Sequence, residues 1–322
     1  MRAIASLCGA MLWLAGKLAS AAPLYALSQE GASLAVIDPR QDRVLRQIAV
    51  DDKPAMMALS PDGARLYLTH PDLAQISVLD LSAPACGRVI ARWRIDGEPF
   101  GVAADAQSVY VGDWSGDRLL RLSAMDGSVM ASAATGRSPA GVALDAARGR
   151  VFVAARESAR IDAFDIAAPD ALRPLAPIAV GLSPFAIGVH GGDLLVANVK
   201  SNDFSVIDTQ ALRERARLAV GRMPYGVGLG GDGRRWLVAN QQSGTLGEID
   251  IESRRVMRER RVGRYPEGLA VDRDSGKVYV ASWFDDAIAV LADDAPAPRR
   301  IAVAAGPRAL LQAPVEPRGC DA

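Results

Sequence analysis

The sequence predicts an all-β protein, a seven-bladed β-propeller built from four-stranded antiparallel blades. Three observations predict it. Prolines in the same setting recur at intervals of 40 to 45 residues, at Pro54, Pro99, Pro139, Pro184, Pro224, Pro266 and Pro307. Each interval contains short runs of alternating apolar and polar residues separated by turn signals, which is typical of strands. Each interval also has room for four such strands, the content of one propeller blade.

Each unit begins with a joint, a Gly followed three residues later by the Pro. Four units show it in full, at Gly136, Gly181, Gly221 and Gly263. We expect this joint to carry the chain from the outer edge of one blade to the axis of the next, with Gly supplying a positive φ and Pro fixing the angle of re-entry. The innermost strand that follows is rich in Gly and Ala, as at Gly101, because innermost strands crowd together near the axis. We interpret the joint as structural rather than catalytic.

The second strand of each unit ends in a related tetrapeptide. The seven copies are YALS (25–28), YLTH (67–70), YVGD (110–113), FVAA (152–155), LVAN (195–198), LVAN (237–240) and YVAS (279–282). A polar turn leads from each to a third strand that usually closes on Asp, as in AVID (35–38). A fourth strand, such as residues 217–220, then leads to the next joint.

The phase of the repeats predicts how the ring closes. The chain enters a unit at its second strand, residues 24–27, and finishes after the first strand of another unit, residues 308–312. One blade must therefore combine a C-terminal innermost strand with three N-terminal strands. Such closure leaves no open edge in the ring.

The N-terminus has the features of a signal peptide. Arg2 precedes an apolar run over residues 3–16, and Ala19-Ser20-Ala21 fits the rule for cleavage after small residues. The run is shorter than the roughly 20 residues that a membrane span needs, so we expect export to the periplasm or the medium and no membrane span. The domains that follow from this interpretation are a signal peptide (1–21), the propeller (22–314) and a C-terminal tail (315–322).

Charge and cysteine content narrow the function classes. Lys and Arg together number 37, as do Asp and Glu, and this balance speaks against a nucleic-acid partner.

Removal of the signal peptide leaves Cys86 and Cys320, an even number in an oxidising compartment. We predict that they form a disulfide on the face away from the channel mouth, and two free thiols are the alternative.

The tetrapeptides, the joints and the closing Asp residues resemble those of the YVTN-repeat β-propeller family, over residues 23–313. Propellers of this family are similar to the large non-catalytic subunits of periplasmic quinoprotein amine dehydrogenases, which position a redox subunit and an electron acceptor. The resemblance implies a non-catalytic scaffold without a cofactor of its own, placed beside a dehydrogenase or another redox partner.

One face of the predicted ring collects aromatic and Arg residues, because the joints and the loops between second and third strands emerge there. The aromatic residues are Phe100, Trp114, Phe185, Tyr225, Tyr265, Trp283 and Phe284, and the basic ones are Arg137, Arg156, Lys200, Arg222, Arg264 and Arg308. Aromatic and Arg side chains are enriched in binding hot spots, so we interpret this as the face that binds a protein partner or small ligand, with Trp114 and Trp283 as anchors. The alternative is that the aromatic residues only fill the joints between blades.

The final residues of the tetrapeptides are expected to form a second ring at the same mouth. Among them, Asp113, Asn198 and Asn240 carry oxygens of the kind that Ca²⁺ binds, but the Asn belongs to the repeat motif and serves the turn, so we expect no metal. A lactonase-type hydrolase with a divalent metal at the channel mouth is the alternative function. The two histidines, His70 and His190, are placed on opposite faces and share no site, and no CxxCH, HExxH or CxxC motif occurs.

Overall fold

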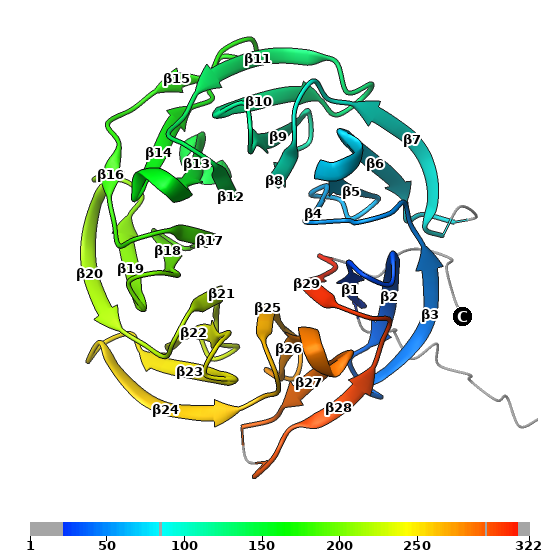
Figure 1. Ribbon diagram of the computed structural model, residues 1–322, viewed down its shortest axis with the longest axis vertical. Helices are drawn as coiled ribbons and strands as arrows, with labels where there is room; N and C mark the ends of the chain where they lie inside the picture. Colours follow the sequence, from blue (N-terminus) through cyan, green and yellow to red (C-terminus); the bar gives the residue numbers. More distant parts are fainter. Residues whose placement is uncertain (1–21, 84–85, 294, 315–322) are drawn as a thin grey trace, which may run out of the picture.

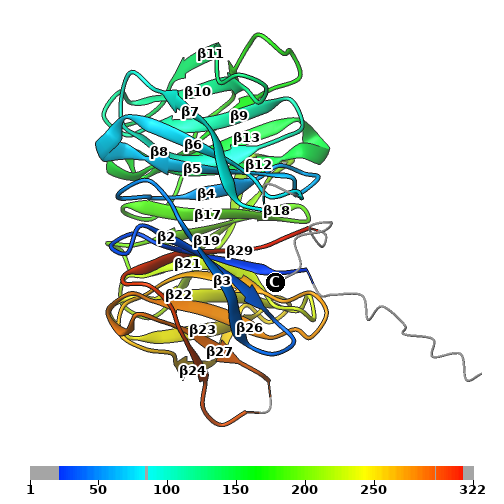
Figure 2. The same ribbon diagram turned by 90° about the vertical axis from the view of Figure 1, so that its right-hand side faces the viewer.

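The computed structural model describes residues 22–83, 86–293 and 295–314. Seven antiparallel sheets surround a central axis (Figure 1), and a side view shows the ring edge-on (Figure 2). The predicted seven-bladed propeller is therefore confirmed. The signal-peptide and tail predictions fall outside these residues. Within the described ranges, no helix has the length and apolar character needed to cross a membrane.

The blades are numbered here from the one that contains the first strand. Blade 1 holds β29 (Pro307–Gln312), β1 (Leu24–Ser28), β2 (Ser33–Asp38) and β3 (Arg43–Ala49). Blade 2 holds β4 (Met57–Leu59), β5 (Arg65–His70), β6 (Gln75–Asp80) and β7 (Arg88–Arg94). Blade 3 holds β8 (Pro99–Ala104), β9 (Ser108–Asp113), β10 (Arg118–Ser123) and β11 (Val129–Ala134).

Blade 4 has a broken outer strand. It holds β12 (Pro139–Asp145), β13 (Arg150–Ala155) and β14 (Arg160–Asp165), with the short outer pieces β15 (Arg173–Pro174) and β16 (Ile178–Ala179). Blade 5 holds β17 (Pro184–His190), β18 (Asp193–Asn198), β19 (Asp203–Asp208) and β20 (Arg213–Ala219).

The last two blades are regular. Blade 6 holds β21 (Pro224–Leu229), β22 (Arg235–Asn240), β23 (Thr245–Asp250) and β24 (Arg255–Arg261). Blade 7 holds β25 (Pro266–Val271), β26 (Val278–Ser282), β27 (Ala287–Leu291) and β28 (Arg299–Ala302). Short 3₁₀ turns interrupt some connections, namely η1 (Pro71–Leu73), η2 (Ala146–Arg148), η3 (Arg156–Ser158) and η4 (Trp283–Asp285).

The ring closes as the phase of the repeats predicts. Strand β1 lies between β2 and β29, and its antiparallel register with β29 pairs Leu24 with Gln312 and Leu27 with Ala309. Figure 1 shows the first and last strands of the chain side by side in one blade. Every residue of β1 is buried, because this strand has a hydrogen-bonded neighbour on each side and a blade on each face.

The hydrophobic core lies between neighbouring blades. Aromatic residues that begin the tetrapeptides, such as Tyr25 and Tyr279, are fully buried. One cluster joins Tyr279 of blade 7 to Leu24 of blade 1, and another joins Tyr25 of blade 1 to Leu66 of blade 2. Each blade therefore buries its two faces against its neighbours, which holds the loops of one face of the ring in fixed relative positions.

Gly is required at the joints for a different physical reason from the expected positive φ. Only Gly263, with a φ of 146°, adopts a positive φ, whereas Gly136, Gly181 and Gly221 do not. The left-handed residue is usually the one just before the Pro, as at Ser138, Ser183 and Met223. A Cβ at Gly221 would instead overlap with the Asn240 side chain. The joint needs Gly because the last side chain of the tetrapeptide occupies that space.

The innermost strands crowd together as expected. A Cβ at Gly101 would overlap with the carbonyl oxygen of Ala140 in the next blade. In the same way, a Cβ at Gly226 would overlap with the carbonyl oxygen of Glu267, and one at Gly268 with that of Arg308. These glycines let neighbouring blades approach closely around the axis.

Cys86 lies in the connection between β6 and β7, as the repeat pattern places it. It adopts a left-handed conformation with a φ of 44°, and its backbone N–H donates to the carbonyl of Ser82 at 2.8 Å. Its predicted partner, Cys320, falls outside the described residues. The Cys86–Cys320 disulfide therefore stays a prediction.

Candidate binding site at the channel mouth

The residues that directly follow the joint prolines form a ring around the axis, because each stands at or just before the start of an innermost strand. We call this set the mouth ring; in blade order it consists of Arg308, Ala55, Phe100, Ala140, Phe185, Tyr225 and Glu267. In Figure 1 the innermost strands of the seven blades surround the axis. The mouth ring thus gathers seven side chains that lie far apart in the sequence.

The aromatic members of the mouth ring meet over the axis. The ring centroid of Phe100 in blade 3 lies 5.6 Å from that of Phe185 in blade 5, in an edge-to-face arrangement. Phe185 in turn lies 4.3 Å from Tyr225 in blade 6. Ala140 of blade 4 stands between them, and its small side chain leaves room for this contact. The aromatic rings therefore cover part of the channel mouth.

Arg308 brings a positive charge into this aromatic cluster. Its guanidinium carbon lies 5.4 Å from the ring centroid of Phe100 and 5.8 Å from that of Trp283, within the range of cation–π attraction. Its Nη1 donates to Gln29 Oε1 at 2.9 Å and its Nη2 donates to the Tyr225 hydroxyl at 3.0 Å. Only 12% of the side chain is exposed. The charge is therefore held in place by partners from several blades.

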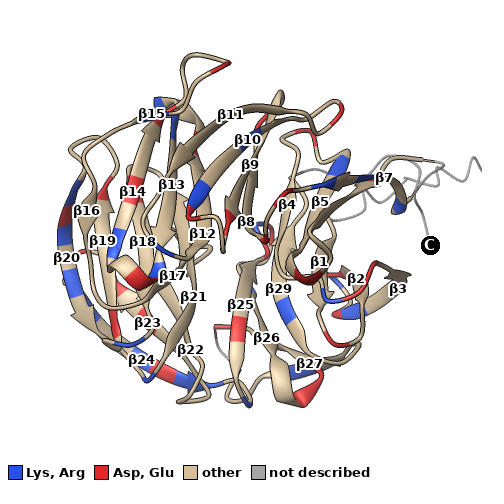
Figure 3. Cartoon of the chain, turned by 45° about the horizontal axis from the view of Figure 1, so that its top comes forward, with Lys and Arg blue, Asp and Glu red and all other residues tan. Residues whose placement is uncertain are grey.

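Glu267 is the acidic partner of Arg308. Its Oε2 lies 3.5 Å from Arg308 Nε, an ion pair without a hydrogen bond, and its Oε1 accepts a hydrogen bond from Gln241 Nε2 at 2.8 Å. Figure 3 shows an acidic segment on β25 and a basic segment on β29, which are neighbouring innermost strands. Burial raises the pKa of the Glu267 carboxyl to about 7, against the opposing effects of Arg308 and Gln241. The Glu267 carboxyl therefore titrates near neutral pH.

A cavity of about 240 Å³ lies along the axis, against the mouth ring. Its walls come from the innermost strands and are mostly apolar, with Val102, Ile187, Leu269 and Leu310 among them. Of the described residues that line it, only Tyr225, Glu267 and Arg308 have polar side chains. The cavity thus combines an apolar body with one polar end.

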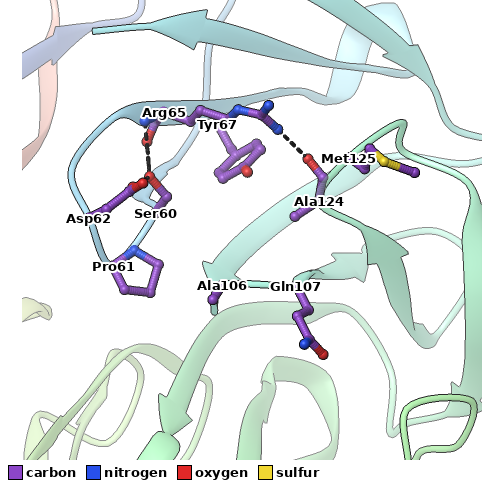
Figure 4. A pocket seen from close by; sticks show the side chains of 9 residues that line it. All are labelled: Ser60, Pro61, Asp62, Arg65, Tyr67, Ala106, Gln107, Ala124 and Met125. Carbon is purple, nitrogen blue, oxygen red and sulfur yellow. Dashed lines mark hydrogen bonds between the residues drawn. The ribbon is translucent and has the colours of Figure 1, made fainter. Parts of the chain in front are cut away.

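A larger hollow, of about 540 Å³, lies between blades 2 and 3 (Figure 4). It is formed by turns on the face opposite the joints, with Ser60, Arg65, Gln107 and Met125 among its lining residues. Arg65 Nη1 donates to the Ala124 carbonyl at 2.6 Å, and Ser60 Oγ donates to Asp62 at 2.5 Å. These polar groups hydrogen-bond to one another, so the hollow leaves fewer polar groups free to bind a ligand than the axial cavity does.

The structure brings some of the aromatic and Arg residues of the predicted binding face into one cluster, and the others lie apart from it. Phe100 and Trp114 lie 5.0 Å apart between ring centroids, and the guanidinium of Arg156 lies 5.7 Å from the Trp114 ring. Trp283 joins this cluster through Arg308. Phe185 is only 5% exposed, so its role is packing over the axis.

The remaining predicted residues lie outside this cluster. Tyr265 and Phe284 form a separate pair with ring centroids 4.9 Å apart, and Phe284 is 52% exposed. Arg264 forms an ion pair with Asp285 at 2.7 Å. Arg137 and Arg222 are exposed, and Arg137 Nη2 donates to the Glu157 carbonyl at 3.2 Å. These residues form an outer rim around the mouth.

The final residues of the tetrapeptides do not form a second ring at the mouth, contrary to expectation. They are at most 1% exposed and lie beneath the joints, at Ser28, His70, Asp113, Ala155, Asn198, Asn240 and Ser282. Their side chains pack inside the fold and do not face the channel mouth, because the joint folds over them.

The three candidate metal ligands illustrate this packing. Asp113 accepts hydrogen bonds from the backbone N–H groups of Glu98 at 2.9 Å and Gly116 at 3.1 Å, and from Arg118 Nε at 2.8 Å. The amide nitrogen of Asn198 donates to Asp203 and to Ser205, and that of Asn240 donates to Thr245, whereas the amide oxygens of both are buried without a hydrogen-bond partner among the described residues. Within the described ranges, no group of three or more His, Cys, Asp and Glu side chains is placed to hold a metal ion.

Comparison with known families agrees with the architecture. The profile of the family described as "YNCE-like beta-propeller" matches residues 32–275, about three quarters of the chain. The chain belongs to this family. This membership confirms the prediction, made from the repeats, that the chain is a YVTN-type propeller. No curated protein sequence matches it significantly.

Solved structures share the fold of this YNCE-like propeller at low sequence identity. A functionally unknown protein from Desulfotomaculum acetoxidans aligns with a TM-score of 0.79 and 12% identity over 92% of this chain and 100% of its own. The hydrazine synthase of Kuenenia stuttgartiensis aligns with a TM-score of 0.69 and 16% identity, over 89% and 99%. The dihydro-heme d1 dehydrogenase NirN, solved in complex with DHE, aligns with a TM-score of 0.63 and 17% identity, over 84% and 61%. At these identities the likeness concerns the fold alone.

Sequence reasoning missed Glu267 and Gln241 as site residues of the YNCE-like propeller. Glu267 stands between Pro266 and the following Gly, in the position that Phe100 and Tyr225 occupy in their own repeats. An aligned set of Pro-x-Gly segments reveals an acid where other blades place an aromatic residue or Ala. Gln241 carries no comparable signal, because it simply follows a tetrapeptide.

The pKa of Glu267 predicts a pH-dependent stability for the YNCE-like propeller. Because folding raises this pKa from 4.5 to about 7, the folded state favours the protonated carboxyl. The Glu267 carboxyl therefore adds most to the free energy of unfolding at a pH below its pKa in the unfolded state. This contribution decreases as the pH rises toward its pKa in the folded state. The decrease amounts to roughly 3 kcal/mol over this window.

The matched variant for this prediction is Glu267→Gln, which retains the size of the side chain and removes the titration. Urea unfolding of both proteins between about pH 4 and about pH 8 gives the difference in their unfolding free energies at each pH. We expect the wild type to lose stability relative to the variant as pH rises. Parallel profiles for the two proteins would contradict the raised pKa.

Proposed function

We propose that this protein is an exported, non-catalytic propeller that captures a partner protein on the face that carries the channel mouth. The observation that carries the proposal is the placement of Trp114 and Trp283 on that face. Both are half-buried, and each lies under a guanidinium, that of Arg156 or that of Arg308. Rigid, partly exposed aromatic residues with Arg neighbours are the side chains that carry most of the energy of protein interfaces.

The surroundings of the two tryptophans support a protein partner. Phe284 next to Trp283 is 52% exposed, and the outer rim adds exposed Arg137 and Arg222. An apolar centre with a charged rim is the usual anatomy of an interface between proteins. The seven blades hold these elements rigidly, so little conformational entropy is lost on binding.

The partner that we propose is a redox protein of the periplasm, such as a dehydrogenase. Support comes from the signal-peptide features of residues 1–21 and from the resemblance of YVTN propellers to non-catalytic subunits of quinoprotein amine dehydrogenases. This part of the proposal rests on likeness of fold, which by itself does not determine function. A protein exported with its partner would meet it in the same compartment.

The lactonase-type hydrolase gains no support from the mouth. Such a site needs a divalent metal or a base there. The oxygens of Asp113 already accept three hydrogen bonds within the fold, and the Glu267 carboxyl accepts from Gln241 and pairs with the Arg308 guanidinium. His70 is fully buried and its Nδ1 lies 2.9 Å from the Asp52 carbonyl. A nucleic-acid partner is likewise not proposed, because basic and acidic residues balance.

Replacement of both Trp114 and Trp283 by Ala should weaken partner capture by about tenfold or more, since two hot-spot anchors are lost. The measurement is recovery of partner from periplasmic extract of the source organism on immobilised protein, followed by titration with the purified partner. Met257→Ala is the matched control, because Met257 is a 62% exposed apolar residue on the outer strand β24. Unchanged capture by the double variant, or a large loss of its thermal stability, would assign the two tryptophans to packing.

A further inference from the structure

We propose that the axial cavity binds a small monocarboxylate with an apolar body, and that Arg308 and Tyr225 hold its carboxylate. This inference goes beyond the proposed function, because it concerns a small molecule within the channel rather than a protein on the face. It depends on the hydrogen-bonding capacity left at the polar end of the cavity, the charge of that end, and the size and polarity of the walls.

The polar end of the cavity has buried hydrogen-bonding capacity that the fold does not use. Arg308 Nε makes no hydrogen bond although it is buried, and neither does Glu267 Oε2. The Tyr225 hydroxyl accepts from Arg308 Nη2, so its own hydrogen is available for donation. Buried polar groups without partners are costly, and Glu267 is only 5% exposed. A ligand that accepts hydrogen bonds from Arg308 Nε and the Tyr225 hydroxyl would satisfy these donors.

The charges at this end favour an anion over a cation. Arg308 keeps its proton under all ordinary conditions, so an ammonium group would face a fixed positive charge in an apolar cavity. A carboxylate instead pairs with the guanidinium, which is suited to planar acids. A doubly charged phosphate would leave excess negative charge beside Glu267. One negative charge is therefore the best match for this site.

Binding of the anion is coupled to a proton. The charged and titratable groups that face Glu267 are Arg308 from β29 and Tyr225 from β21, with Arg156 also acting on Tyr225. A second anion next to Arg308 would raise the cost of ionising Glu267, whose pKa already lies near neutrality because of burial. The Glu267 carboxylate therefore takes up a proton from the buffer when the ligand carboxylate binds. The site remains close to neutral overall.

The walls determine the body of the ligand. A volume of about 240 Å³ is smaller than that of pockets for drug-sized ligands. The walls are apolar, so the body that they accept is a short hydrocarbon chain or a single ring. A hollow on the opposite face shares Val227, Leu269 and Leu310 with the cavity and is lined by His190 and Gln312. The ligand would reach the cavity from that side, since aromatic side chains cover part of the other.

Titration calorimetry of the purified full chain with hexanoate tests the inference, with hexanol and hexylamine as probes of the same body and a different head group. We expect hexanoate to bind at neutral pH and the other two to bind about tenfold more weakly or not at all. In two buffers with different enthalpies of protonation, the binding enthalpy should differ in the direction of proton uptake. Absence of hexanoate binding, or preference for hexylamine, would overturn the proposal.

Variants assign the roles of the two charged residues. Glu267→Gln should bind hexanoate without proton uptake, whereas Arg308→Gln should bind it about tenfold more weakly or worse. Arg308→Lys retains the charge and is a second test in case Arg308→Gln does not fold. Arg137→Gln, on the outer rim, should bind like the wild type. Equal affinity of the folded Arg308 variants and the wild type would overturn the role of the guanidinium.

The two proposals fail independently. The single variant Trp114→Ala should still bind hexanoate, because Trp114 neither lines the cavity nor stacks on Arg308, whereas Trp283 does stack on it. If hexanoate binds and no partner is captured, the proposed function fails and the carboxylate site stands. If a partner is captured through the tryptophans and hexanoate does not bind, the carboxylate site alone is wrong.

Discussion

A chain that ends at Gly306 is expected not to fold into a stable closed ring. The missing segment contains β29, which pairs with β1 from Leu24 to Ser28 and places Leu310 in the core between blades. Without it, the buried edge of β1 loses its hydrogen-bond partners and the apolar faces of blades 7 and 2 lose a neighbour. The loss should exceed about 5 kcal/mol, which is comparable with the whole stability of many domains. Circular dichroism and size-exclusion chromatography measure the result.

The matched control is a chain that ends at Pro314, which keeps β29 and removes the C-terminal tail. Neither chain contains Cys320, so the predicted Cys86–Cys320 disulfide does not contribute to the difference. A synthetic peptide of residues 307–314 should restore ordered structure to the shorter chain by strand addition at β1. If the shorter chain unfolds cooperatively within a few degrees of the control, β29 is dispensable and the expectation is wrong.

Replacement of Gly101 by Ala should lower the free energy of unfolding by about 3 kcal/mol or more, at the upper end of the cost of overpacking. The added Cβ would overlap with the Ala140 carbonyl oxygen of the neighbouring blade. A backbone atom of a closed ring cannot move aside as a flexible side chain does, because any shift of one blade disturbs the contacts of the next. Urea unfolding followed by tryptophan fluorescence measures the loss.

Gly192→Ala provides the control for this prediction. Gly192 is exposed, does not have a positive φ, and the nearest atom to an added Cβ is the end of the Arg148 side chain at 3.6 Å. Its replacement should change the stability by less than about 0.5 kcal/mol, as is usual for surface substitutions. Equal stability of the two variants would show that the inner strands can separate at little cost.

The sequence predicts the architecture well because each blade repeats the same local pattern. The spacing of the prolines gives the number of blades, and the phase of the first and last units gives the closure through β29. Both are confirmed, since strand patterns and turn residues act over short stretches of chain. The innermost glycines were also explained correctly, because crowding near the axis follows from the geometry of any propeller.

The candidate site was harder to predict because it depends on residues from many blades. Whether Phe100 meets Phe185 over the axis depends on the small side chain of Ala140 between them, a relation that no single repeat contains. The ion pair of Glu267 with Arg308 likewise joins two repeats, and only alignment of all repeats places both in the mouth ring. The tetrapeptide ends were misplaced for a related reason, since the joint of the next blade buries residues such as Asp113.

The pairing of β1 with β29 makes the earliest strand of the propeller dependent on the latest one to leave the ribosome. Until residues 307–312 emerge, β1 has a partner on one side only, so a nascent or prematurely ended chain keeps an unpaired strand edge and stays open to proteases and chaperones. Ring closure therefore waits until residues 307–312 have emerged from the ribosome, and a chain that stops before this segment cannot complete the ring.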